Sequence, residues 1–200
     1  MSRTVDYYFS IASPWSYLGH GRCMELLTKH GAGVNVKPVD YGKIFPVSGG
    51  LPLKQRAPQR QAYRLVELAR WRDFLAVPLT VEPKFFPFPA DVAARAVIAA
   101  DIVKGPVVAM RLAYALMQGC WVQDRNVGDP ETVSAIVREQ GFDPAAFGAV
   151  AVAADAQAKY ALYTEEAIAR GVFGAPSYVV GDEIFWGQDR LEFLDRRLAK

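Results

Sequence analysis

The stretch Phe9-Ser-Ile-Ala-Ser-Pro-Trp-Ser-Tyr17 marks the point at which a strand passes into a helix. Residues 5–9 form a short run of β-branched and aromatic side chains, which is typical of a strand. Ser13 suits the N-cap of a helix, and Pro14 suits its first position, where an N–H would have no helical partner. The sequence therefore predicts a strand over residues 5–9 and a helix that follows Ser13 and runs to about His30.

Two further segments extend this pattern. Residues 34–39 predict a second strand, which completes a βαβ unit with parallel strands and a right-handed crossover. Residues 177–180 and 183–186 flank Gly181-Asp182 and predict a hairpin, which a helix over residues 189–198 follows.

Helical spacing fills the region between these strands, interrupted by proline-rich joints at residues 43–52 and 81–89. The candidate helices are residues 58–74, 90–102, 107–121, 130–139 and 145–170, the last broken within its alanine-rich part. The fold class is therefore α/β, a thioredoxin-like core (βαβ … ββα) with a large all-helical domain inserted. We expect the core at residues 1–42 and 171–200, and the insertion at residues 43–170.

Composition argues against several classes of function. The 200 residues have a formal charge of +2 from interspersed charges, so no basic face for nucleic acid is expected. No stretch approaches the ~20 apolar residues of a membrane helix, and the start does not resemble a signal peptide, so we expect a soluble cytoplasmic protein. Cys23 and Cys120 form no CxxC and have no nearby histidine, which argues against zinc and against a dithiol centre. We expect both thiols to be buried and inert, and His20 to be structural or solvent-facing.

Ser13 is the first candidate for chemistry. A helix N-terminus presents free backbone N–H groups and partial positive charge, which favour an anion such as a thiolate. A free thiol has a pKa near ~8.5 and is only about 3% ionised at pH 7, so a hydrogen bond from the Ser13 hydroxyl would help to activate it. The alternative is that Ser13 only caps the helix.

Two later motifs also have a functional and a structural interpretation. In Gly171-Val-Phe-Gly-Ala-Pro-Ser-Tyr-Val-Val180, a cis Pro176 would turn the backbone of Ala175 toward the first helix, where a peptide-like ligand could add as a short strand, although trans bonds are commoner. In Phe185-Trp-Gly-Gln-Asp-Arg190, the side chains of Gln188 and Asp189 suit a ligand's α-ammonium group, or they cap the last helix.

Together these motifs resemble the DsbA-type thioredoxin branch that contains 2-hydroxychromene-2-carboxylate isomerases and kappa-class glutathione transferases. The likeness covers the whole chain, and residues 60–71 and 83–87 also resemble the isomerases' helical domain. It implies that Ser13 replaces the attacking cysteine of redox relatives and that Pro176 is cis. The residues that would hold glutathione are Ser13, Arg60, Ala175, Pro176, Gln188 and Asp189. Two positions depart from the family: Gly50 replaces a common asparagine, and Arg60 a common lysine.

The resemblance implies a reaction without metal, in aromatic hydrocarbon catabolism. Glutathione thiolate adds reversibly to a conjugated carbon, so that 2-hydroxychromene-2-carboxylate and trans-o-hydroxybenzylidenepyruvate interconvert. The candidate aromatic wall is Phe45, Trp71, Phe85, Phe86 and Trp186, and the candidates for the substrate carboxylate are Lys84, Arg56 and Arg60. The alternative for the aromatic side chains is ordinary packing in the core. The alternative for the basic side chains is a solvent-exposed face.

Two other functions remain open. A kappa-like transferase or peroxidase would consume glutathione with the same thiolate, and a non-catalytic thioredoxin-like module would bind a peptide along Ala175-Pro176. In the first interpretation the partners are a small aromatic carboxylate and a second copy of the chain, and we expect a homodimer.

Overall fold

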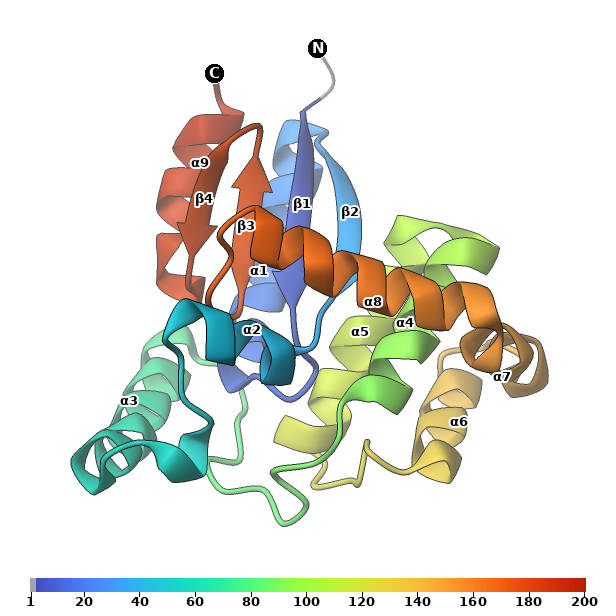
Figure 1. Cartoon of the computed structure of the whole chain (residues 1–200), viewed down its shortest axis with the longest axis horizontal. Helices are drawn as coiled ribbons and strands as arrows, with labels where there is room; N and C mark the ends of the chain where they lie inside the picture. Colours follow the sequence, from blue (N-terminus) through green and yellow to red (C-terminus); the bar gives the residue numbers. More distant parts are fainter. Residues whose placement is uncertain (1–2) are drawn as a thin grey trace.

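One four-stranded sheet organises the molecule, with its strands in the order β2-β1-β3-β4 (Figure 1). The computed structural model describes residues 3–200, and its strands are β1 (Thr4–Phe9), β2 (Gly33–Pro38), β3 (Ser177–Val180) and β4 (Glu183–Trp186). β1 pairs parallel with β2 and antiparallel with β3, and β3 pairs antiparallel with β4. The predicted parallel pair and late hairpin are therefore confirmed.

Helices cover the sheet and extend to one side of it. They are α1 (Pro14–His30), α2 (Tyr41–Ser48), α3 (Pro58–Leu75), α4 (Asp91–Lys104), α5 (Pro106–Trp121), α6 (Pro130–Glu139), α7 (Pro144–Val152), α8 (Ala154–Ala169) and α9 (Leu191–Leu198), with short 3₁₀ turns η1 (Leu53–Gln55) and η2 (Gln188–Arg190). The helices expected from the sequence are confirmed, and the expected break separates α7 from α8. None of the helices within residues 3–200 has the length and apolar character needed to span a membrane.

Helix α2 corrects one expectation, because part of the predicted joint over residues 43–52 is helical. The Asp40 carboxylate caps α2 by accepting from the N–H of Gly42. Tyr41 and Ile44 are buried against the face of the sheet that α8 covers. Their burial outweighs the helical hydrogen bond that Pro46 cannot make.

β1 is buried on both faces. Its odd-numbered residues point toward α1, where the Tyr7 hydroxyl lies 3.1 Å from Nδ1 of His20. Its even-numbered residues point toward α8, which crosses the front of the sheet in Figure 1 while α1 lies behind it. The expected domain division at residues 43 and 170 stays a prediction, but in packing α8 belongs with the sheet, and α4 and α5 share the large core cluster with β1 and α1.

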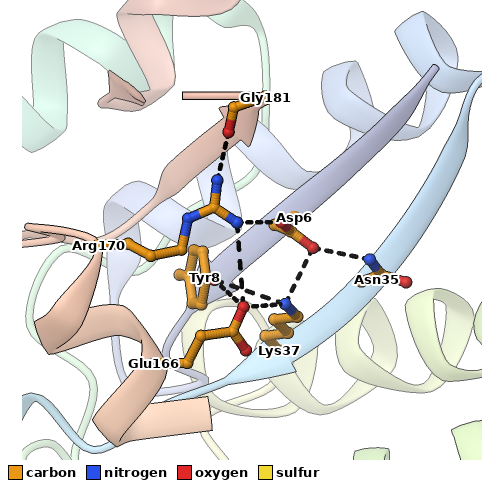
Figure 2. Close-up of polar contacts among 7 residues, drawn as sticks. All are labelled: Asp6, Tyr8, Asn35, Lys37, Glu166, Arg170 and Gly181. Atoms are coloured by element: carbon orange, nitrogen blue, oxygen red, sulfur yellow. Dashed lines mark hydrogen bonds and ion pairs between the residues drawn. The ribbon is translucent and has the colours of Figure 1, made fainter. Parts of the chain in front are cut away.

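A mostly buried ion network joins α8 to this face of the sheet (Figure 2). Lys37 Nζ lies 2.9 Å from Asp6 Oδ1 and 2.6 Å from Glu166 Oε1. Arg170 lies 2.7 Å from the other oxygen of Asp6 and also donates to the carbonyl of Gly181 in the hairpin turn. Two carboxylates therefore face two cations, and the cluster balances its own charge.

Smaller polar contacts complete the network. The Tyr8 hydroxyl donates to Glu166 over 2.9 Å, and Asn35 donates to Asp6 over 2.7 Å. Burial opposes ionisation of Asp6, but hydrogen bonds from Asn35 and Lys37, together with the charges of Lys37 and Arg170, hold its pKa below the ordinary value of 3.8. Ionised Asp6 therefore stabilises the fold above that value, and this contribution is lost as the pH falls through the lowered pKa.

Lys37→Met is expected to lower the free energy of unfolding by roughly 2–4 kcal/mol, because it leaves two partly buried carboxylates without their shared cation while Asp6 keeps Arg170. The matched control is Lys29→Met, which removes an exposed ion pair with Asp195 and should cost at most ~1 kcal/mol. Urea unfolding at pH 7 measures both. Equal losses for the two variants would contradict a stabilising role for the network.

Candidate active site

Ser13 stands between β1 and α1 and caps the helix. Its Oγ accepts from the N–H of Ser16 over 3.1 Å, and its backbone is extended, with φ −94° and ψ 118°. Pro14 follows as the first helical residue, as predicted. Because the oxygen accepts this bond, the hydroxyl hydrogen stays available to donate, and capping does not exclude work on a bound thiolate.

The start of α1 carries no thiol. Ser16 is fully buried, and its hydroxyl has no hydrogen-bond partner among the described residues. Cys23 and Cys120 are both buried, and burial raises the pKa of each thiol to about 12, so both are inert as expected. His20 is also buried, with Nε2 2.9 Å from the carbonyl of Met110, and burial lowers its pKa to about 4.

The Ala175–Pro176 bond is cis, as the resemblance implied. Tyr8 of β1 pairs with Ser177, so this loop lies at the end of the sheet where β1 leads to Ser13. Within the structure of residues 3–200, the backbone N–H and C=O of Ala175 have no hydrogen-bond partner. A peptide-like ligand could therefore pair with Ala175 without displacing a bond of the protein.

The residues around Ala175 are held firmly. The Gly174 carbonyl accepts from the Tyr41 hydroxyl and from Ser177 Oγ, each over 2.7 Å. A Cβ added at Gly174 would lie 2.2 Å from the indole nitrogen of Trp186, so the indole packs directly on the loop. Trp186 is half exposed, and its ring lies 4.6 Å from that of Phe173. The structure thus brings the predicted residue Trp186 next to the loop.

Gln188 and Asp189 lie at the start of the closing helical segment, but their environments differ. Gln188 is buried against Gly19 of α1, and its side-chain oxygen accepts from Arg22 over 3.1 Å. Its amide oxygen therefore anchors this segment to α1, and a ligand would have to share it. Asp189 is exposed, and its carboxylate lies 2.5 Å from the Arg190 guanidinium.

The other predicted residues lie on α2, on α3 and in the loop before α4. Phe45 is half-buried on α2, and a Cβ at Gly50 would lie 2.4 Å from its ring, which explains the glycine there. Arg60 is exposed in the first turn of α3. Lys84 and Phe85 are exposed and contact each other, with Nζ 5.1 Å from the ring centroid.

A cavity of about 420 Å³ opens beside Ala12, the neighbour of Ser13. Sequence reasoning did not find it, because its walls come from four separate segments. The lining residues are Ser10, Ala12, Val39, Asp40, Tyr41, Gly42, Phe88, Pro89, Ala90, Asp91 and Tyr160. Across residues 3–200, no three side chains of the metal-binding types gather into a site.

The fold is thioredoxin-like, and a serine, Ser13, caps its first helix. These features define a class of thioredoxin-like proteins without a dithiol centre. The model of the DSBA-like thioredoxin domain family matches residues 4–199. The chain is 30% identical over 199 residues to the 2-hydroxychromene-2-carboxylate isomerase of Sphingobium xenophagum, with 99% of each protein covered. It therefore belongs to the DsbA-like thioredoxin family, in the branch of the 2-hydroxychromene-2-carboxylate isomerases, and is an isomerase.

Two further comparisons agree with this assignment. The solved structure of a 2-hydroxychromene-2-carboxylate isomerase matches with a TM-score of 0.79 at 28% identity, covering 98% of this chain and 94% of that one. The human protein named glutathione S-transferase kappa 1 is 23% identical, with 100% of this chain and 92% of that protein covered. Both matches extend over the helical region as well as the sheet.

Gly174→Ala is expected to lower the free energy of unfolding by about 1–3 kcal/mol, because its Cβ would overlap the indole of Trp186. Gly148→Ala is the matched control, since a Cβ there meets nothing within 4 Å and alanine favours helix α7. Thermal unfolding compares the two variants. If Gly174→Ala were as stable as wild type, the close packing of Trp186 on the loop would be wrong.

Proposed function

We propose that this isomerase uses glutathione and interconverts 2-hydroxychromene-2-carboxylate with trans-o-hydroxybenzylidenepyruvate. The observation that carries the proposal is the placement of Ser13, whose hydroxyl hydrogen is free at the N-terminus of α1. The name of the human relative supports glutathione as the thiol, and the names of the bacterial relatives support the substrate.

Glutathione would bind in an extended form across the end of the sheet. Its cysteinyl backbone pairs with the free N–H and C=O of Ala175 beside Pro176, and its sulfur lies at Ser13. Asp189 receives the γ-glutamyl ammonium, while Arg60 suits a glutathione carboxylate. Buried Gln188 supports this arrangement by holding the segment that presents Asp189.

The protein's part in the chemistry is to supply a thiolate at neutral pH. Lowering the thiol pKa by ~2 units would raise the ionised fraction from about 3% to roughly 75%. The cyclic hemiketal of the chromene opens as its ring C–O bond breaks and the hydroxyl proton passes to the phenol oxygen. The thiolate then adds to the conjugated carbon and the π electrons move to the ketone oxygen as an enolate, so the former double bond can rotate. Elimination restores the alkene and releases glutathione unchanged. The helix N-terminus and Ser13 stabilise the sulfur anion before addition and after elimination.

The cavity beside Ala12 offers room for the aromatic part of the substrate. Phe45, Phe85 and the more exposed Trp186 are the candidate aromatic contacts of this substrate. Lys84, whose side chain is exposed, remains a candidate contact for the substrate's carboxylate.

A glutathione transferase or peroxidase is the second candidate, because the human relative carries a transferase name and the same thiolate would serve substitution. Product analysis separates the two, since an isomerase returns all of its glutathione. We also propose that the enzyme works in the cytoplasm as a homodimer, and size-exclusion chromatography tests the dimer.

Ser13→Ala is expected to fold normally and to lose about 10- to 150-fold in isomerase rate at pH 7. A charge-assisted hydrogen bond contributes about 1.5–3 kcal/mol, whereas a lost N-cap costs only ~1 kcal/mol of stability. Part of the rate should return at alkaline pH, where glutathione ionises without help. The pH–rate profile measures this, with exposed Ser48→Ala as the control.

Ser13→Cys should not restore the rate, because its own thiolate would compete for the helix N-terminus and form a mixed disulfide with glutathione. Wild-type activity of Ser13→Ala at pH 7 would reduce Ser13 to a helix cap.

Asp189→Ala is expected to raise KM for glutathione while leaving kcat nearly unchanged. A contact to the remote ammonium is equally strong in ground and transition states, so its loss appears in binding. Calorimetric titration with glutathione measures the affinity, and Asp182→Ala in the exposed hairpin turn is the control. Unchanged affinity would remove Asp189 from the site.

A further inference from the structure

Three arginines near the start of α3 form a basic cluster without acidic partners. Arg56, Arg60 and Arg64 are spaced four residues apart, and the last two share one face of the helix. No carboxylate within residues 3–200 forms an ion pair with any of them. Arg56 donates to the carbonyl of Leu51 over 2.8 Å, and the guanidinium of Arg64 has no hydrogen bond in the described structure.

This cluster contrasts with the ion network in Figure 2, where each cation faces a carboxylate. Arg64 is partly buried, and burial together with the charge of Arg56 lowers its pKa to about 10. Burial and the charge of Arg60 also lower the pKa of Arg56. An uncompensated cation in a partly buried position disfavours the folded state, so the arrangement is suited to receive an anion.

Aromatic rings connect the cluster to the cavity beside Ala12. The guanidinium carbon of Arg56 lies 5.9 Å from the Phe45 ring, and that ring lies 5.5 Å from the ring of Tyr41, which lines the cavity. On the other side, the guanidinium carbon of Arg64 lies 5.3 Å from the ring of Phe86.

Phe86 stands two residues before Phe88, which also lines the cavity. Helix α3, which carries Arg60 and Arg64, and the loop before α4 both lie below the sheet in Figure 1.

The cavity itself carries carboxylates, Asp40 and Asp91. Asp91 is paired with Arg95 over 3.0 Å, whereas Asp40 has no ion pair among the described residues. Burial and these carboxylates raise the pKa of Tyr160 above its ordinary value, although the charge of Arg95 opposes the rise. A carboxylate placed beside Asp40 would be repelled, whereas a hydroxyl group could donate to Asp40. The cavity therefore has an unpaired carboxylate, and the arginine cluster has unpaired cations.

We propose that Arg64, assisted by Arg56, binds the carboxylate of the substrate and so orients its aromatic ring into the cavity, where Asp40 would repel that carboxylate. This inference rests on the proposed function, whose substrate is an aromatic carboxylate. It places the carboxylate on Arg64 rather than on Lys84, whose side chain is exposed and contacts Phe85. Arg60 remains assigned to glutathione.

Arg64→Gln tests the assignment. KM for the substrate should rise about 10- to 100-fold, as expected for the loss of a charge-assisted pair, while KM for glutathione stays unchanged. Arg64→Lys keeps the charge and should recover part of the affinity. The control is Arg70→Gln, which removes an exposed arginine farther along the same helix. A weakened glutathione affinity, or an unchanged substrate KM, would overturn the assignment.

Stability separates binding from a structural role. Removing a like charge from the cluster should leave the unfolding temperature of Arg64→Gln equal to or above that of wild type. A clear decrease would mean that Arg64 serves the fold, and would also overturn the proposal.

A binding measurement separates this inference from the proposed reaction. Wild-type protein should bind trans-2-hydroxycinnamate but not its carboxamide, and Arg64→Gln should lose that preference. If the wild type fails to isomerise the chromene, the proposed function falls and cinnamate binding still tests Arg64. If the wild type isomerises but Arg64→Gln binds cinnamate normally, only the inference about Arg64 falls.

Discussion

The burial of β1 on both faces is the constraint from which the rest of the structure follows. One face is apolar and aromatic, but the other carries Asp6, which stays ionised inside the protein only because Lys37 and Arg170 approach it. Arg170 stands at the end of α8, so satisfying Asp6 docks that helix on the sheet (Figure 2). Because α8 ends at Ala169 and β3 begins at Ser177, a short segment must connect them. This connection places the Ala175 loop at the end of β1.

The charged side chains of this protein fall into two groups, one paired within the fold and one left unpaired. Beneath α8, carboxylates and cations balance, and such a cluster contributes to structure without attracting a ligand. At α3, the arginines face no carboxylate, and beside Ala12 the carboxylate of Asp40 lines an open cavity without an ion pair among the described residues. This separation of charge would orient a ligand with one charged end, because the ligand is attracted at the arginines and repelled at the cavity. Apolar walls alone would not select one orientation.

The differences between expectation and structure concern packing. The joint around Pro46 was expected to be irregular, yet Tyr41 and Ile44 gain enough burial to hold a helix there. Gln188 was expected to contact a ligand or to cap the last helix, and its amide oxygen also accepts from Arg22 inside the protein. Neighbouring residues in the sequence do not reveal either contact, because the partners come from distant segments.

The sequence by itself determined the strands, the helix start at Ser13-Pro14, the hairpin and the family resemblance, because caps, turns and hydrophobic periods depend on residues a few positions apart. Arg64 showed no local signal, since its importance lies in the absence of a carboxylate nearby and in the ring of Phe86 beside it. Only the tertiary structure decided which charges were paired and which were left for a ligand. Ion pairing and burial depend on which segments meet in space. Lys37 and Glu166, for example, are 129 positions apart in the sequence but 2.6 Å apart in the fold.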